Sequence, residues 1–146
     1  MVVTVKVTRL KFIKMMKKLG LILATVLFAV ATFALTASPA HAETHKVKMG
    51  SDTGQLVYVP DTLTVAPGDT VEFVMNKLAP HNVVFDSSGV PSGAESIASS
   101  LTMSKLLFSP GQSYSITIPD DAPKGEYQYY CQPHRGAGMN GQLIVK

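Results

Sequence analysis

The region after residue 42 consists of short runs of alternating apolar and polar residues, separated every few positions by residues that favour turns. A period of two is typical of strands that bury one face. Proline, glycine and aspartate cluster between the runs, as at residues 67–69 and 119–123, where they fix or tolerate turn dihedral angles. The pattern predicts strands at residues 45–49, 56–59, 62–65, 70–75, 82–86, 113–118, 125–130 and 141–145.

Eight short strands in about a hundred residues predict one all-β domain, an antiparallel Greek-key sandwich or barrel around a single core. Residues 94–107 lack a clear alternation and would allow a turn or two of surface helix. We therefore expect at most one short helix.

The first 42 residues have a different character. Six of the 13 basic residues lie before position 19, and no acidic residue precedes Glu43. An uncharged apolar stretch at 19–37 leads to Ala40 and Ala42, which fit the small-residue pattern of a signal-peptidase site. We predict a cleaved signal peptide at 1–42, exported in an unfolded state, and a mature domain at 43–146. The alternative is an uncleaved membrane anchor, since about 20 apolar residues span a bilayer.

The mature domain is acidic, because residues 43–146 hold all ten acidic residues and seven of the 13 basic ones, a net charge of −3. The basic character of the whole chain belongs to the export segment, so we do not expect nucleic-acid binding. Cys131 is the single cysteine and cannot form an internal disulfide. A lone exported thiol is an intermolecular bridge, a reactive group or a metal ligand.

Cys131, His134 and Met139 supply a thiolate, an imidazole and a thioether within nine positions, between the last two predicted strands. Two histidines, one cysteine and a weak axial methionine are the ligand set of electron-transfer copper sites. Gly136 and Gly138 would let the chain curl so that Met139 returns to the metal. The segment therefore predicts a copper site.

The second imidazole must come from elsewhere in the mature domain, which offers His45 and His81. We favour His81 because it follows a proline at the mouth of a predicted strand, whereas His45 lies close to the new N-terminus. Asn82 could then hydrogen-bond the cysteine sulfur or tie the two ligand segments together. Zinc fits less well, since methionine rarely binds it. A Cys/His hydrolase with Asn82 as its third member is a further alternative.

The mature region resembles the cyanobacterial type of the plastocyanin family, small blue copper proteins with a cupredoxin fold. The stretches that carry the resemblance are GSDTGQL, VAPGDTVEF, PHNVVFD, SPGQSY and GEYQYYCQPHRGAGMNG. The resemblance implies a monomeric carrier without enzymatic activity that holds one copper ion. It also implies a place in the thylakoid lumen, where the carrier accepts an electron from cytochrome f and donates it to photosystem I.

The resemblance further implies an apolar docking face around His134, a second contact position at Tyr130, and an arginine, Arg135, that faces acidic partners. The positions that match the apolar face are Gly54, Leu56, Pro80, Gly136 and Ala137. The acidic patch of plant relatives is reduced here to Asp86 and Glu95, so we do not expect strong electrostatic steering through that region.

Other functions remain open. A blue copper donor to a different periplasmic partner, similar to pseudoazurin, would have the same ligand set. A copper-delivery protein would favour labile, exposed ligands. A copper oxidase would need a second copper site, for which the mature domain has only His45 to spare.

Overall fold

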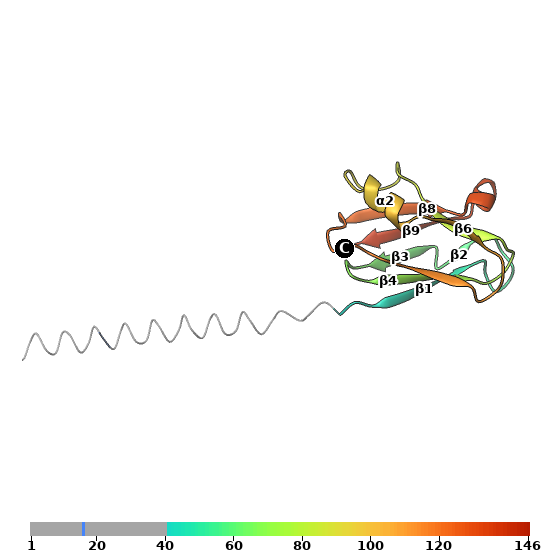
Figure 1. Ribbon diagram of the computed structural model, residues 1–146, viewed down its shortest axis with the longest axis horizontal. Helices are drawn as coiled ribbons and strands as arrows, with labels where there is room; N and C mark the ends of the chain where they lie inside the picture. The colour runs from blue at the N-terminus through green and yellow to red at the C-terminus, as the bar shows by residue number, and fades with distance from the viewer. Residues whose placement is uncertain (1–15, 17–40) are drawn as a thin grey trace, which may run out of the picture. The chain divides into compact units, whose positions relative to one another are not determined.

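The computed structural model describes Met16 and residues 41–146. Most of the predicted signal peptide, residues 1–15 and 17–40, lies outside the described residues, and its cleavage stays a prediction. Residues His41–Lys146 form one compact unit (Figure 1). In the part of the chain that is described, no helix is long and apolar enough to cross a membrane.

The compact unit contains nine strands, one short α-helix and one 3-10 helix. In chain order they are β1 (Thr44–Met49), β2 (Tyr58–Val59), β3 (Thr62–Val65), β4 (Thr70–Met75), β5 (His81–Phe85), α2 (Glu95–Leu101), β6 (Met103–Leu107), β7 (Ser113–Thr117), β8 (Gly125–Tyr130), the 3-10 helix η1 (Gln132–Ala137) and β9 (Asn140–Val145).

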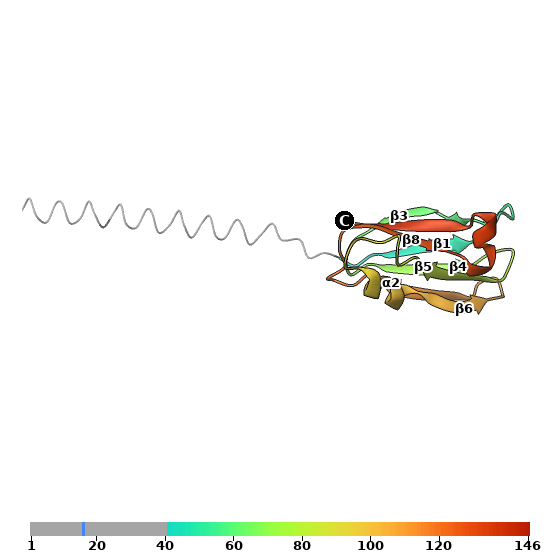
Figure 2. The same ribbon diagram turned by 90° about the horizontal axis from the view of Figure 1, so that it is seen from above.

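The strands form two sheets that lie face to face (Figures 1 and 2). One sheet has the order β2-β1-β4-β7 and the other β3-β9-β8-β5-β6. The predicted all-β Greek-key sandwich with one short helix is confirmed, and the barrel alternative is not. The sheets are not antiparallel throughout, because β1 pairs with β4 and β3 with β9 in parallel.

The ninth strand, β6, is the element that the sequence did not predict. The residues before it form the expected short helix α2, but Met103–Leu107 pairs with β5 at the edge of its sheet. Leu107 alone is buried in β6, and its other residues are exposed or half-buried. An edge strand that buries so little has no alternating apolar pattern to reveal it.

In the predicted strands, the apolar residues of the alternating pattern face the interior of the sandwich. Aromatic rings fill the centre, where the Tyr129 ring lies 4.8 Å from that of Tyr58 and 5.5 Å from that of Phe73. On β8 every second residue faces inward, so Tyr127 and Tyr129 are buried. Cys131 follows in the same phase and is also fully buried. The strand periodicity thus directs the single thiol into the interior.

Candidate metal centre

The four predicted ligands come from two segments of the chain that meet at one end of the sandwich. His81 begins β5, Cys131 directly follows β8, His134 lies in η1, and Met139 precedes β9. Strands β5 and β8 are antiparallel neighbours, with Val84 opposite Tyr130, so the segment after β8 runs beside the beginning of β5. In both ribbon views η1 lies at the end of the sandwich opposite the C-terminus (Figures 1 and 2).

Three of the side chains form a tight triangle of ligand atoms. The Cys131 Sγ lies 3.4 Å from the Nδ1 atoms of both His81 and His134, and these two nitrogens are 3.2 Å apart. The point equidistant from three atoms with these separations lies about 1.9 Å from each of them, close to metal–nitrogen and metal–thiolate bond lengths of about 2.0–2.3 Å. The residues present therefore fit one metal ion.

The backbone fixes the orientation of His81. Its Nε2 lies 2.7 Å from the Lys77 carbonyl oxygen, so this nitrogen carries the proton and donates a hydrogen bond to the carbonyl. The Nδ1 is then left unprotonated and faces Cys131. Burial lowers the pKa of His81, and the nearby His134 acts in the same direction against the Lys77 hydrogen bond. A neutral imidazole with a free Nδ1 is the form that binds a metal.

Cys131 is fully buried, so its thiolate form is stable only beside a positive charge. Burial raises the pKa of the thiol, while the backbone N–H groups of Asn82 and His134 and the Tyr58 hydroxyl oppose this effect. A metal ligand must be deprotonated, and a bound cation supplies the charge that makes a buried thiolate stable.

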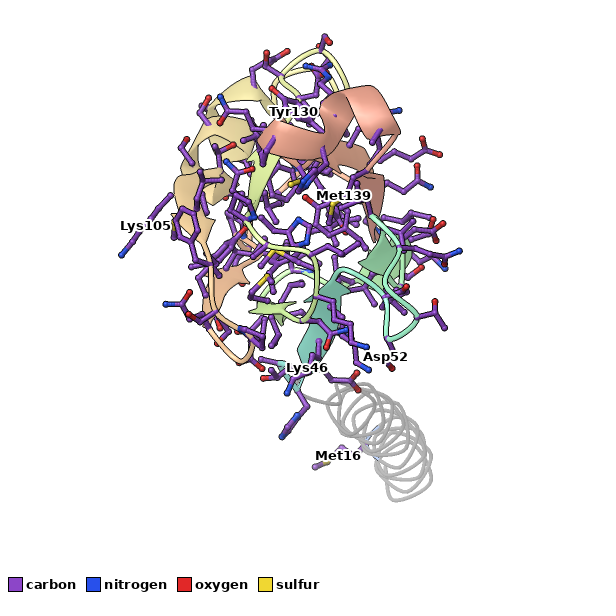
Figure 3. All side chains as sticks on the ribbon, turned by 90° about the vertical axis from the view of Figure 1, so that its right-hand side faces the viewer. Met16, Lys46, Asp52, Lys105, Tyr130 and Met139 are labelled. Atoms are coloured by element: carbon purple, nitrogen blue, oxygen red, sulfur yellow. The ribbon has the colours of Figure 1, made fainter. Side chains whose placement is uncertain are left out.

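Met139 is fully buried, and its backbone closes the ligand loop. The Cys131 N–H donates to its carbonyl oxygen at 3.0 Å, and its own N–H donates to the His134 carbonyl oxygen at 3.2 Å. Gly138, which precedes it, has a left-handed φ of 82°, so this glycine supplies the predicted curl, whereas Gly136 has no positive φ. Figure 3, which faces this end, shows Met139 near its middle and Tyr130 close to η1 at one side.

Asn82 links the two ligand segments. Its Oδ1 accepts a hydrogen bond from the Gln132 N–H at 2.8 Å, and its Nδ2 donates to the Gln132 Oε1 at 3.2 Å and to the Ser104 carbonyl at 3.1 Å. The side chain is fully buried. Of the two contacts that the sequence suggested for this amide, the structure shows the tie between segments.

His134 is the predicted ligand nearest to solvent, since it is half-buried whereas the other three are buried. The small residues of the predicted docking face, Gly54, Gly136 and Ala137, are exposed, and Leu56 and Pro80 are partly exposed. The Asn76 amide donates to the Gly50 carbonyl at 2.8 Å, which joins the segment that carries Leu56 to the one that carries Pro80.

Arg135 is held by two neighbours. Its guanidinium donates to Asp86 Oδ2 at 2.9 Å and lies 3.9 Å from the centre of the Tyr130 ring. The three side chains border a polar cavity of about 540 Å³ between β8, β9 and the beginning of β3. Hydrogen bonds from the Ser88 hydroxyl and N–H hold the pKa of Asp86 below its usual value, and the charge of Arg135 adds to this effect. This carboxylate is therefore charged at neutral pH.

Sequence reasoning missed three contacts at this end of the molecule: the Lys77 carbonyl that orients His81, the Gln132 amide that meets Asn82, and the ion pair between Asp86 and Arg135. A backbone carbonyl has no sequence signature, because every residue has one. Asp86 and Arg135 are 49 positions apart, and only the pairing of β5 with β8 brings them together.

A two-layer β-sandwich that gathers two imidazoles and a buried thiolate at one end defines the class of small blue copper proteins. Comparison with known proteins gives the family. Residues 45–146 match the family described as copper binding proteins, plastocyanin/azurin family. The chain belongs to this family, and its cofactor is copper.

Plastocyanins are among its most similar relatives. The plastocyanin of Nostoc punctiforme is 47% identical over 131 residues, covering 90% of this chain and 94% of the relative. A plastocyanin of a Synechococcus species is 50% identical over the same shares of the two chains. The structure of oxidised plastocyanin from Dryopteris crassirhizoma is similar with a TM-score of 0.59 and 35% identity, covering 69% of this chain and 99% of that one. The predicted family is confirmed, and the chain is a blue copper electron carrier of the plastocyanin type.

Proposed function

We propose that His81, Cys131, His134 and Met139 bind one copper ion, and that the protein carries single electrons from cytochrome f to photosystem I in the thylakoid lumen. The mature form, residues 43–146, would act as a monomer without enzymatic activity. The observation that carries the ligand assignment is the triangle of His81 Nδ1, Cys131 Sγ and His134 Nδ1, with edges of 3.2–3.4 Å.

Bound copper would supply a centre that alternates between the cuprous and cupric states. The protein's part is to hold the ligands in place throughout. His81 is fixed by Lys77, and the cysteine segment is fixed to β5 through Asn82 and Gln132. Ligands that are positioned before the metal arrives need little movement when the charge on the metal changes, which keeps the barrier to electron transfer low.

The electron would leave through His134, because this imidazole is the ligand closest to solvent. Small residues next to it, Gly136 and Ala137, allow a partner's cofactor to approach without a buried charge in between. Leu56, Pro80 and Gly54 would extend this face. The contact is suited to brief binding, because few groups must be desolvated or ordered.

Tyr130 and Arg135 would form a second contact region for an acidic partner. The guanidinium carbon lies over the Tyr130 ring, 3.9 Å from its centre, which gives this surface one fixed positive charge. Because Asp86 neutralises part of that charge, attraction to an acidic partner should be modest and sensitive to salt.

The test is the rate at which the reduced, copper-loaded protein re-reduces flash-oxidised photosystem I, and the matching rate of its own reduction by cytochrome f. Leu56→Ala and Arg135→Glu should each slow these reactions, by about tenfold for the charge reversal at low ionic strength. Lys146→Glu, a charge reversal at the C-terminus, is the matched control and should leave the rates nearly unchanged.

Equal rates for Leu56→Ala, Arg135→Glu and the unaltered protein would reject the docking face. Absence of any reaction with photosystem I would reject these partners and favour a donor to another periplasmic protein.

A further inference from the structure

Asp69 is a buried carboxylate at the end of the sandwich away from the metal centre, and it accepts three hydrogen bonds. Its Oδ1 accepts from the Glu43 backbone nitrogen at 2.9 Å, and its Oδ2 accepts from the Ala66 N–H and the His45 Nε2, both at 2.9 Å. The Glu43 carbonyl in turn accepts from the Thr70 N–H at 2.8 Å. Residue 43 is therefore held through both its nitrogen and its carbonyl.

Glu43 is also the residue that follows the predicted cleavage site. In the precursor its nitrogen belongs to a neutral peptide bond, whereas cleavage after Ala42 converts it into an α-amino group with an ordinary pKa of about 7.7–8.0. We propose that Asp69 is a receptor site for this new α-ammonium group, so that removal of the signal peptide turns a neutral hydrogen bond into an ion pair. The proposal rests on the predicted cleavage site and is independent of the copper chemistry.

The charge state of Asp69 suits this role. Burial alone would favour the neutral acid, but the N–H groups of Ala66 and Glu43 and the His45 side chain outweigh it, and the pKa of Asp69 lies below its ordinary value. The carboxylate is thus an anion at neutral pH. Within residues 41–146, His45 is the titratable side chain that hydrogen-bonds the Asp69 carboxylate. A buried anion that accepts from backbone N–H groups gains further when one of these donors carries a full positive charge.

The position of the contact gives it a consequence for folding. Strand β1 begins at Thr44, directly after the clamped residue, and lies between β2 and β4 inside its sheet. The beginning of β1 pairs with β4, with Thr44 opposite Thr70, so loosening it would free the beginning of β4 inside the sheet. The ion pair should therefore protect the domain as a whole. The precursor lacks the ion pair and would be easier to keep unfolded for export, and the mature chain gains stability once it has been cut.

The test uses the full-length precursor exported by a bacterial host, with the new N-terminus identified by intact mass. A second precursor carries Gly-Ser inserted between Ala42 and Glu43, which returns the Glu43 nitrogen to a neutral amide. The natural form should have a folding equilibrium constant about fivefold to tenfold larger than the extended form. This difference should disappear when both carry Asp69→Asn.

Asp120→Asn is the matched control. The Asp120 carboxylate lies beside Gly68, the neighbour of Asp69, but the Glu43 nitrogen donates to Asp69 and not to Asp120. The difference should survive in this variant. A mass that places the N-terminus elsewhere, equal stabilities of the natural and extended forms, or a difference that persists in Asp69→Asn would each overturn the proposal.

A second measurement needs no substitution at Asp69. The pKa of the α-amino group, obtained from the pH dependence of its acylation rate, should be higher in the natural form than in the extended one, because the carboxylate favours the charged amine. Equal values would overturn the proposal.

Discussion

Replacing Asn82 with alanine tests whether one buried amide holds the two ligand segments together. The side chain is fully buried and makes three hydrogen bonds, at 2.8 Å with the Gln132 N–H, 3.2 Å with the Gln132 Oε1 and 3.1 Å with the Ser104 carbonyl. Alanine would remove all three. At about 1 kcal/mol net for each bond, the free energy of unfolding should fall by about 3 kcal/mol.

The assay is urea unfolding of the mature, copper-free domain, followed by circular dichroism and extrapolated to water. The exposed Asn140→Ala, at the same end of the molecule, is the control and should change the free energy by less than about 0.5 kcal/mol. Asn82→Asp keeps the acceptor for the Gln132 N–H but loses both donors, so it should also destabilise the domain.

In the copper-loaded protein, Asn82→Ala should also loosen the cysteine segment, which would broaden or shift the visible copper band. A loss of stability no larger than that of Asn140→Ala, together with an unchanged band, would refute the role of Asn82 in joining the segments.

Further predictions concern the ligands, the docking region and pH. His81→Gln should abolish the visible copper band, whereas His45→Gln should preserve it. Removal of copper should lower the midpoint of thermal unfolding, because the ion binds the folded state. Asp86→Asn should free Arg135 and raise the rate with an acidic partner about twofold to threefold at low ionic strength. Because the pKa of Asp69 is lowered in the folded protein, its stabilisation is complete above the ordinary carboxyl pKa and lost as pH falls through the folded value. The stability difference between the unaltered protein and Asp69→Asn, measured from pH 7 to pH 3, should therefore shrink toward acid.

Each of these predictions has a matched control or a contradicting result. Glu95→Gln removes the same charge as Asp86→Asn without releasing Arg135, so an equal rate increase in both would show a general charge effect. Loss of the band in His45→Gln, with its survival in His81→Gln, would reverse the ligand assignment. If the copper-free protein unfolds at the same temperature as the copper-loaded one, the predicted stabilisation by copper is wrong. If the stability difference between the unaltered protein and Asp69→Asn does not change with pH, the predicted role of the Asp69 charge is wrong.

The sequence predicted the parts of the molecule that depend on local patterns. Alternation marks the strands that bury one face, and the spacing of Cys131, His134 and Met139 places three candidate ligands on one short loop. Strand β6 was not predicted, because it lies at the edge of its sheet and only Leu107 in it is buried. The parallel pairings of β1 with β4 and β3 with β9 could not be predicted, since period-two patterns do not state strand direction.

Contacts between distant residues also lay beyond sequence reasoning. The contact of Arg135 with a partner stays a prediction, and sequence reasoning did not find that its guanidinium is paired with Asp86 and lies over the Tyr130 ring. His45, which sequence reasoning did not favour as a ligand, hydrogen-bonds the buried Asp69, a contact that the sequence did not predict. In each case the partner is defined by strand pairing.

The most direct test of the copper assignment is the visible absorption spectrum of the protein loaded with cupric ion. A thiolate ligand at Cys131 predicts one intense thiolate-to-copper band at a stoichiometry of one ion per chain, and its loss in Cys131→Ser. A copper-bound protein without colour, or an unchanged band in Cys131→Ser, would contradict the account.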